Sequence, residues 1–297
     1  MSSFANLKRQ SQSGNLDKLS AKIKELNSST ESSDRSENFW RPEVDKSGNG
    51  MATIRFLPAP SVDGDDGLPW VKLFSHGFQG PGGWLIDNCL TTRGQPCPVC
   101  EHNSALWNSG IEANKEIVRK QKRKLNYITN VYIVSDPKRP ENEGTIKLFK
   151  FGKKIFDKIT EAMNPQFEDE KAINPFDMWT GANFKLKIRK VEGYQNYDKS
   201  EFESASVLLD DDAALEKIWK SEHTLAEQVG DKEFKSYEQL KNRLDKVLGL
   251  NGVTPKTTVE TIKAAAPKLR VVEEISAIVS STEDDDMSYF SKLAEEE

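Results

Sequence analysis

Three cysteines and one histidine, spaced like a set of metal ligands, constrain this chain more than any other feature of its sequence. They follow the pattern His76-x12-Cys89-x7-Cys97-x2-Cys100, and no other cysteine occurs among the 297 residues. An odd number of cysteines, in a chain whose first residues lack the apolar region of a secretory signal, argues against a disulfide framework. Thiolates together with an imidazole are the usual ligands of structural zinc. The pattern therefore predicts one zinc ion, in a loop-rich subdomain over about residues 70–107.

Two histidines compete for the fourth ligand position. His102 follows Cys100 by two residues, whereas His76 precedes all three cysteines. We prefer His76, because structural zinc sites commonly take two ligands from each of two separated segments. Four protein ligands leave no open coordination position, which predicts a structural rather than a catalytic metal. The alternative is three buried free cysteines beside an ordinary surface histidine.

Catalytic motifs match these residues only in part. The stretch from Pro96 to Cys100 fits half of the zinc nucleobase-deaminase signature, but the other half requires His-x-Glu, and here Phe78 stands in place of the Glu. A redox Cys-x-x-Cys pair would need a βαβ pattern around it, which the sequence does not show. The glycine-rich run 80–83 lacks the Gly-Lys-Ser/Thr of a phosphate-binding P-loop. We therefore predict that the protein is not an enzyme.

The distribution of charge is more informative than its sum. The net charge is −5, yet residues 115–158 hold thirteen basic and five acidic residues, whereas residues 251–297 hold five basic and ten acidic ones. Seven of these acidic residues lie in two clusters that form an acidic tail: Glu283, Asp284, Asp285, Asp286, Glu295, Glu296 and Glu297. Such asymmetry is typical of a basic binding surface combined with an acidic tail.

Three basic strips of sequence each lie beside aromatic residues, around positions 120–127, 147–154 and 185–197. Cations that follow phosphates and rings that stack on unpaired bases suit single-stranded nucleic acid. The alternative for each ring is a place in the core, and for each lysine run a solvated face. The recurrence of both features favours a binding surface. The predicted DNA contacts are Lys120, Lys122, Arg123, Lys124, Tyr127, Phe149, Lys150, Lys153, Lys154, Lys187, Arg189, Tyr194 and Tyr197.

Hydrophobic periodicity predicts an α+β core between two tails. Alternating and β-branched runs predict strands over 51–57, 125–134, 145–151, 183–191 and 201–209. Helical spacing predicts helices over 153–163, 213–229 and 237–248. Residues 1–35 form a basic arm, residues 36–250 the core, and residues 251–297 a linker and an acidic tail expected to be disordered. No run of 18 apolar residues occurs, so no membrane association is expected.

Several ordered strings give the chain a family resemblance over about residues 36–250. They include Gly48-Asn-Gly, Ile54-Arg-Phe-Leu-Pro, Asp136-Pro, Pro140-Glu-Asn-Glu-Gly, Phe151-Gly-Lys-Lys-Ile, Gly181-Ala-Asn-Phe and Asn196-Tyr-Asp. With His76-Gly-Phe and Cys97-Pro-Val-Cys, the chain resembles the helix-destabilising single-stranded DNA-binding proteins of T-even-like bacteriophages. One departure is Ile128, at a position where the family carries Trp.

The resemblance implies an OB-fold core, which is a Greek-key β-barrel, with a zinc-binding subdomain and peripheral helices. It implies zinc ligands at His76, Cys89, Cys97 and Cys100. It also implies a DNA cleft to which Arg123, Tyr127, Phe149, Tyr194 and Tyr197 contribute. The arm, represented by Lys8, Arg9 and Ser11, would bind neighbouring copies and make DNA binding cooperative. The tail would contact phage replication, recombination and repair proteins in the cytoplasm of the infected bacterial host.

Overall fold

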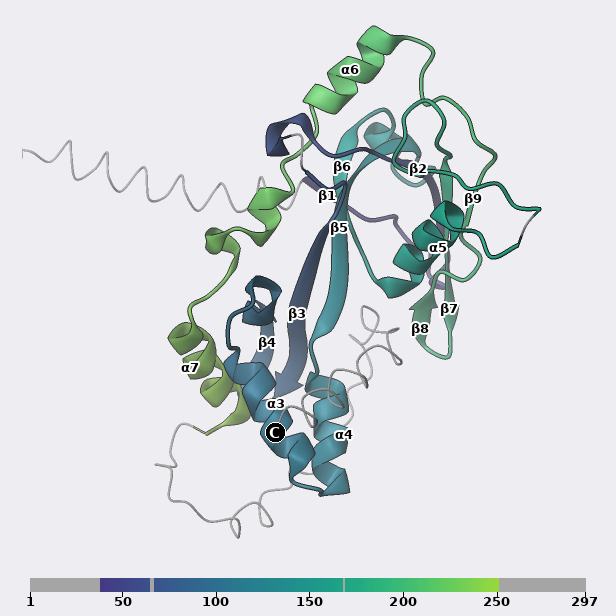
Figure 1. Ribbon diagram of the computed structural model, residues 1–297. Helices are drawn as coiled ribbons and strands as arrows, with labels where there is room; N and C mark the ends of the chain where they lie inside the picture. Colours follow the sequence, from purple (N-terminus) through teal and green to yellow (C-terminus); the bar gives the residue numbers. More distant parts are fainter. Residues whose placement is uncertain (1–37, 65–66, 168, 251–297) are drawn as a thin grey trace, which may run out of the picture. The chain divides into compact units, whose positions relative to one another are not determined.

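The computed structural model describes residues 38–64, 67–167 and 169–250 (Figure 1). The chain divides into two units, Met1–Trp40 and Arg41–Glu297. Of the first unit, little beyond strand β1 (Phe39–Trp40) is described. Every feature below belongs to the second unit.

The second unit is a mixed α+β structure. Its described strands are β2 (Gly50–Phe56), β3 (Val71–Gly80), β4 (Gly83–Asn88), β5 (Lys124–Ser135), β6 (Ile146–Phe151), β7 (Phe184–Val191), β8 (Tyr194–Asn196) and β9 (Glu201–Phe202). Its described α-helices are α3 (Pro98–Asn108), α4 (Glu112–Gln121), α5 (Lys153–Met163), α6 (Asp212–Lys220) and α7 (Tyr237–Leu248). Short 3-10 helices are η1 (Ser61–Asp63), η2 (Leu90–Arg93), η3 (Pro140–Asn142), η4 (Ala226–Val229) and η5 (Asp231–Glu233).

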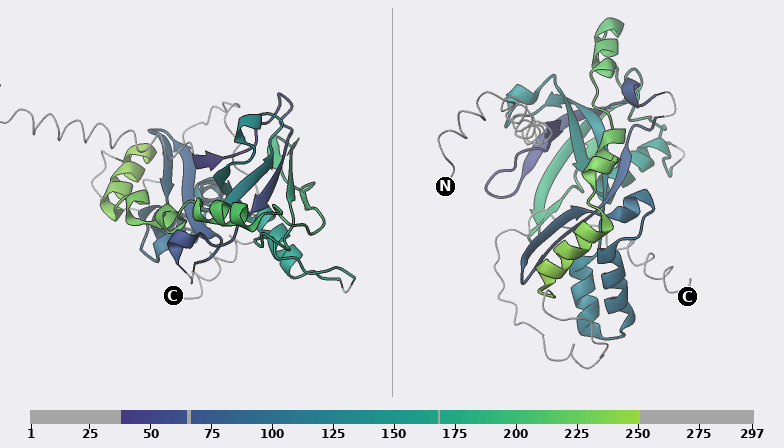
Figure 2. Two further views of the ribbon diagram at one scale, coloured as in Figure 1. Left: turned by 90° about the horizontal axis from the view of Figure 1, so that it is seen from above. Right: turned by 90° about the vertical axis from the view of Figure 1, so that its left-hand side faces the viewer.

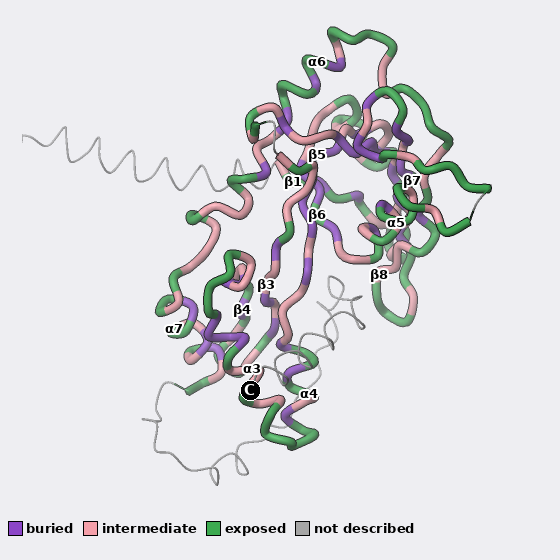
Figure 3. Tube along the Cα trace, viewed as in Figure 1, coloured by how far each residue is buried: buried purple, intermediate pink, exposed green. Residues whose placement is uncertain are grey.

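The strands pair antiparallel, and β5 joins most of them. Its first part pairs with β3, its middle with β6 and its last part with β2, which pairs in turn with β7. β4 extends the sheet beyond β3, while β8 and β9 pair with β7. The period of two in the sequence explains β7, where Phe184, Leu186 and Ile188 are buried and the residues between them face outward. The buried segments in Figure 3 follow these strands.

Aromatic rings fill the interior beside β2, β6 and β7. The ring of Phe56 lies 6.0 Å from Phe151, 5.8 Å from Phe176, 5.6 Å from Phe184 and 6.1 Å from Phe202, measured between centroids. These tilted and edge-on arrangements are the favoured geometries of aromatic pairs. We call the rings around Phe56 the aromatic interior.

A second hydrophobic cluster surrounds the cysteines, at the end of β3 where Figure 1 shows β4, α3, α4 and α7. Its buried members are Phe78, Leu85, Cys89, Leu90, Cys97, Val99, Cys100, Leu240, Leu244 and Val247. The last three come from α7, which packs on β4 and α3 (Figure 2). We call this group the cysteine cluster core. Residues that are about 150 positions apart in the sequence pack together in it.

The turn of the β3–β4 hairpin explains the glycine-rich run. The backbone N–H of Gly82 donates to the carbonyl of Val247 at 2.8 Å. A Cβ atom at Gly80 would lie 2.4 Å from the same carbonyl oxygen, and one at Gly82 would lie 2.0 Å from that of Lys246. Glycine is therefore needed at these two positions so that α7 can approach the hairpin. The role of the glycine-rich run is to allow this close packing.

One buried cation holds three segments together beside β2. Arg55 has no exposed surface. Its Nε donates to Asn183 Oδ1 at 3.0 Å, its Nη1 to the carbonyl of Asp177 at 3.1 Å, and its Nη2 to the carbonyl of Ser206 at 2.8 Å. Burial lowers the pKa of Arg55, against the attraction of Asp177 and Glu203. The hydrogen bonds satisfy a guanidinium that would otherwise be costly to bury.

Six predicted elements are confirmed, namely the strands at 51–57, 125–134, 145–151 and 183–191 and the helices at 153–163 and 237–248. Helix α7 begins with a capping box between Ser236 and Gln239 and ends at Gly249 in the left-handed conformation. Both helix-end signals, the capping box and the glycine, can be read from the sequence alone.

Two predictions were wrong in extent. The helix predicted over 213–229 ends at Lys220. Beyond it, the side chain of Asn130 on β5 accepts from the N–H of His223 and donates to its carbonyl, which ties this segment to the sheet. The strand predicted over 201–209 ends at Phe202. Beyond it the chain turns so that Ser206 can accept from Arg55.

Strands β3, β4 and β8 and helices α3 and α4 were not predicted, and three of them, β3, β4 and α3, occupy the region expected to be loop-rich. The buried face of α4 consists of Asn114, Val118 and Gln121. Two of these three side chains are polar, so the apolar spacing that indicates a helix is missing. Strand β8 follows a tight turn at Glu192 and Gly193, both with positive φ, which is the geometry of a two-residue hairpin.

Candidate metal centre and nucleic-acid interface

Four buried side chains bring their donor atoms together beside β3. The ligand atoms of His76, Cys89, Cys97 and Cys100 all lie within 4.8 Å of one another. The Sγ atoms of Cys89 and Cys100 are 3.5 Å apart, and Nε2 of His76 lies 3.5 Å from Cys97 Sγ and 3.7 Å from Cys100 Sγ. Ligand atoms about 2.0–2.3 Å from a tetrahedral metal are separated by roughly 3.5–3.8 Å. The cluster therefore has the size of a tetrahedral metal site.

Two segments supply these ligands. His76 lies on β3 and Cys89 directly follows β4, so the hairpin carries one pair. Cys97 is the N-cap of α3 and Cys100 stands in its first turn, with Pro98 at the first helical position. The start of a helix favours negative charge, which favours the thiolate forms. His102 points elsewhere, since it is outside the cluster that the described residues form.

The titration of the cluster also favours a bound cation. Burial acts to lower the pKa of His76, but its hydrogen bonds with Cys89 and Cys97 outweigh burial and raise the pKa to about 9. Hydrogen bonds with Cys100 and Cys89 lower the pKa of Cys97, while contacts with Cys89 and Cys97 raise the pKa of Cys100. Without a cation the thiols cannot all ionise together. A divalent metal removes this conflict, because it binds the deprotonated forms of all the ligands.

The first basic strip lies between α4 and β5, next to the cysteine cluster core. Arg123 is half-buried, with its guanidinium 4.1 Å above the ring of Phe74 and Nη1 2.5 Å from Thr91 Oγ1. Lys124 donates to the carbonyl of Gly77 at 3.3 Å, and burial lowers its pKa to about 8. Lys120 is exposed and Lys122 is half-buried. The side chains of Phe74 and Thr91 next to Arg123 were not predicted, because β3 and η2 approach it only in the fold.

Two of the predicted stacking rings lie inside the protein. Tyr127 is 6% exposed and stacks on Phe156 of α5, with centroids 3.9 Å apart and planes at 1°. Phe149 is 3% exposed and stacks on Phe151 at 5.3 Å. Both rings therefore have the environment of core residues in this structure, and their contact with DNA stays a prediction.

The β7–β8 hairpin presents the third strip to solvent. Tyr194 is 47% exposed, Tyr197 is half-buried, and the basic residues of β7 point outward between the buried ones. Each of three cations has a carboxylate partner: Lys185 pairs with Glu203, Lys187 with Glu201, and Arg189 with Asp198. A phosphate that binds here must displace or share these carboxylates.

The second strip is split between a strand and a helix. Lys150 on β6 and Lys154 on α5 are exposed, and Lys153 pairs with Asp157 one turn along α5 at 3.2 Å. Exposed ion pairs of this kind contribute little to stability. The exposed Lys150 and Lys154 are accessible to an anionic ligand.

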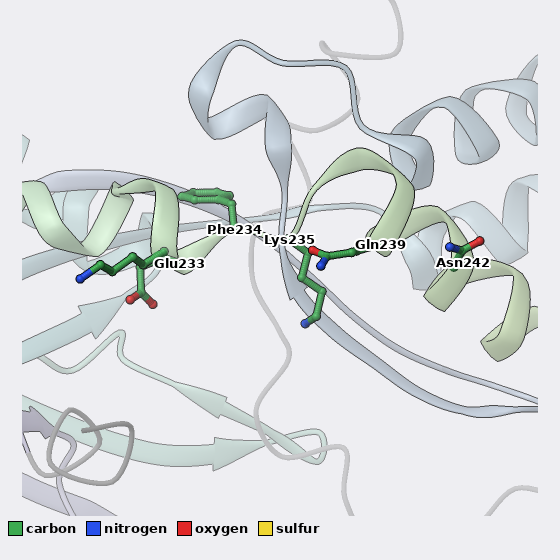
Figure 4. A pocket seen from close by; sticks show the side chains of 6 residues that line it. Glu233, Phe234, Lys235, Gln239 and Asn242 are labelled. Carbon is green, nitrogen blue, oxygen red and sulfur yellow. The ribbon is translucent and has the colours of Figure 1, made fainter. Parts of the chain in front are cut away.

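An open depression of about 680 Å³ lies on η5 and the start of α7 (Figure 4). It is lined by Lys232, Glu233, Phe234, Lys235, Gln239 and Asn242. None of the predicted DNA contacts lines it, so it is separate from the three strips.

The arm residues Lys8, Arg9 and Ser11 and the seven acidic tail residues lie outside the described residues. Within the described part of the chain, no helix is long and apolar enough to cross a membrane.

Comparison with known proteins gives consistent matches. A family model described as gp32 DNA binding protein like matches residues 48–248. The chain is 35% identical over 279 residues to a single-stranded DNA-binding protein of Enterobacteria phage T4, which covers 91% of this chain and 90% of that protein. It is 36% identical over 261 residues to one of Enterobacteria phage T2, covering 84% and 83%. A further relative from Enterobacteria phage RB70 is 41% identical over 92 residues, covering 30% of this chain and 73% of the relative.

Proposed function

Because the chain belongs to the gp32 DNA binding protein like family, we propose that it binds single-stranded DNA without reading base sequence. The family match over residues 48–248 carries this proposal. Binding to single strands but not to duplex shifts the melting equilibrium toward open DNA by mass action. The protein would act in this way during replication, recombination and repair of phage DNA in the infected host, as a stoichiometric binder rather than an enzyme.

Exposed cations on three strips support the proposal. We assign phosphate contacts to Lys120, Lys122, Arg123, Lys124, Lys150, Lys153, Lys154, Lys187 and Arg189, and stacking to Tyr194 and Tyr197. Tyr127 and Phe149 would contact bases only if their surroundings open. Stacked rings add affinity on any base, since every base has a π-face.

We assign one Zn²⁺ to His76, Cys89, Cys97 and Cys100. The donor set and the spacing of its atoms support zinc, because three thiolates and an imidazole suit it better than magnesium or calcium. With four protein ligands, the ion would hold the hairpin and α3 together and perform no catalysis.

We assign an OB-fold to the sheet. Three features support this assignment: the antiparallel pairing of β2 with both β5 and β7, the register shift within β2 at Thr53 and Ile54, and the aromatic interior.

We further assign cooperative self-association to residues 1–35 and partner binding to residues 251–297. The acidic tail would compete with DNA for the basic strips, so removing residues 280–297 would tighten binding to single strands at low salt.

Titration of the protein with fluorescent oligo-dT and with matched duplex, at several salt concentrations, tests the function. We expect strong binding to the single strand, weak binding to duplex, and an affinity for the single strand that falls as salt rises. Absence of affinity for oligo-dT at low salt would overturn the proposal and leave a metal-stabilised protein-interaction scaffold.

A further inference from the structure

One hydroxyl group connects the metal cluster to Arg123. Thr91 Oγ1 lies 3.0 Å from Cys89 Sγ and 2.5 Å from Arg123 Nη1. An arginine can only donate hydrogen bonds, and a metal-bound thiolate can only accept them. A threonine hydroxyl does both, so Arg123 donates to Thr91 and Thr91 donates to the sulfur of Cys89. If Cys89 holds a metal as a thiolate, its sulfur can only accept, and the direction of both hydrogen bonds of Thr91 is then fixed.

The second anchor of Arg123 is the ring of Phe74 on β3, which is hydrogen-bonded to the segment that carries Thr91. The guanidinium lies 4.1 Å above the ring of Phe74. The N–H of Phe74 donates to Thr92 Oγ1 at 2.9 Å, and its carbonyl accepts from the N–H of Cys89 at 2.8 Å. The ring and the hydroxyl that orient Arg123 are therefore both held by the segment Cys89–Thr92.

The net charge of the metal-bound cluster would strengthen the hydrogen bonds of this bridge. Three thiolates and a neutral imidazole around a dication leave the cluster with one net negative charge. The positive Arg123 reaches that charge through a single intervening hydroxyl, and hydrogen bonds with charged ends are the stronger ones. A cation fixed in one orientation loses less conformational entropy when it binds a phosphate.

We propose that Thr91 is a positioning residue, which connects Arg123 to the candidate metal ligand Cys89 and orients Arg123 toward DNA phosphate. The proposal rests on the proposed binding of single-stranded DNA. Groups around a metal site that hydrogen-bond its ligands commonly tune metal affinity about 10- to 100-fold. Here the same group would also tune a contact outside the metal site.

A double-mutant cycle tests the bridge in full-length, metal-loaded protein. Thr91→Val removes the hydroxyl with little change in shape, Arg123→Ala removes the cation, and the double variant removes both. We expect Thr91→Val to weaken binding to oligo-dT about three- to tenfold in protein that still contains metal, and the double variant to bind as Arg123→Ala does. Thr91→Ser keeps the hydroxyl and should bind like the unmodified protein.

Metal release provides a second readout that needs no DNA. A zinc-sensitive dye, added with excess chelator, should report release about tenfold faster from Thr91→Val. Release from Arg123→Ala should also be faster, because Arg123 hydrogen-bonds Thr91, which contacts Cys89. Thr160→Val is the matched control, because its hydroxyl donates to the carbonyl of Phe156 within α5. This variant should change neither readout.

Three results would overturn the bridge. One is Thr91→Val with unchanged affinity and unchanged metal release. Another is a double variant whose loss of affinity equals the product of the two single losses, because Thr91 would then act independently of Arg123. The third is faster metal release without any change in affinity. If the unmodified protein fails to bind oligo-dT, the proposed function fails, and an Arg123→Ala release rate equal to that of the unmodified protein then overturns the bridge separately.

Discussion

The aromatic interior and the cysteine cluster core are stabilised in different ways. Four rings surround Phe56, each with its centroid about 6 Å or less from that of Phe56, and large apolar surfaces are buried without any ligand. The cysteine cluster core instead places three thiols and a histidine at the centre of a smaller apolar group. Its three thiols cannot all ionise together unless a cation is bound. The comparison shows that one region is completed by its own side chains, whereas the other gathers four donor atoms that could hold a metal.

Removing the metal should have the largest effect, confined to the cysteine cluster core. Cys97→Ser should unfold the hairpin, α3 and α7 locally, because binding of structural zinc contributes on the order of 10 kcal/mol in small zinc domains. Amide hydrogen exchange should show lost protection over residues 71–108 and 237–248, with β2, β5 and β6 still protected. His102→Ala is the control, and it should keep both metal and protection. Uniform loss of protection across the sheet would show that the two regions are not independent.

Truncating a ring of the sheet should have the next largest effect. Tyr127→Ala should destabilise folding by about 3–5 kcal/mol, because the ring is buried against Phe156. Tyr194→Ala, at an exposed ring, should leave the melting temperature unchanged and weaken binding to oligo-dT by about 1–3 kcal/mol. Thermal unfolding and oligonucleotide titration of both variants separate core rings from stacking rings. If Tyr127→Ala melts normally but binds poorly, Tyr127 is a stacking ring in spite of its burial.

A buried carboxylic acid should make stability depend on pH. Glu222 is 6% exposed, and among the described residues neither of its oxygens has a hydrogen-bond partner. Burial, with the nearby Asp63, raises the pKa of Glu222 from 4.5 to about 9. The folded state therefore holds a proton that the unfolded state releases above pH 4.5. The stability contributed by this group is complete below pH 4.5 and is lost as pH rises toward about 9.

Glu222→Gln should accordingly stabilise the protein by about 1–3 kcal/mol at pH 7, with a gain that grows between pH 5 and 9. Urea unfolding at several pH values measures it. Glu216→Gln is the matched control, since Glu216 is exposed and pairs with Lys220. A gain that is equal at pH 5 and pH 8 would contradict a buried proton at Glu222.

The smallest expected effect concerns Lys124. Burial lowers the pKa of its ammonium group to about 8, and a bound phosphate favours the charged form. Affinity for oligo-dT should therefore fall as pH rises from 7 to 9, by about the contribution of one charge contact, or roughly 1 kcal/mol. Lys124→Arg should remove most of this pH dependence, because arginine stays charged. A Lys124→Arg variant with the same pH profile as the unmodified protein would assign the titration to another group.

The sequence was most informative where chemistry requires particular residue types. The four ligands stood out because few other functions need this spacing of Cys and His. The strands with strict alternation and the helix with a capping box at Ser236 were also predictable, since those signals are local.

Features that depend on distant contacts were not predictable in the same way. The end of helix α6 before His223 involves Asn130, which is 93 residues earlier and hydrogen-bonds His223. The polar face of α4 lies in the contact with α3, where Asn103 donates to the backbone carbonyl of Gln121. The burial of Tyr127 depends on the position of α5, and an aromatic residue on a strand carries no sign of which face will be covered. The anchors of Arg123 likewise required β3 and η2 to be in place.

Arg55 sets a condition on the order in which a growing chain can fold. Its acceptors at Asp177, Asn183 and Ser206 lie 122, 128 and 151 residues further along. While the ribosome has released only the first half of the chain, β2 would have to bury a guanidinium with none of these acceptors, which is strongly unfavourable. The sheet can therefore close only after residue 206 has emerged, whereas the four metal ligands are all present once residue 100 has emerged. A nascent chain would bind its metal first and complete its sheet last.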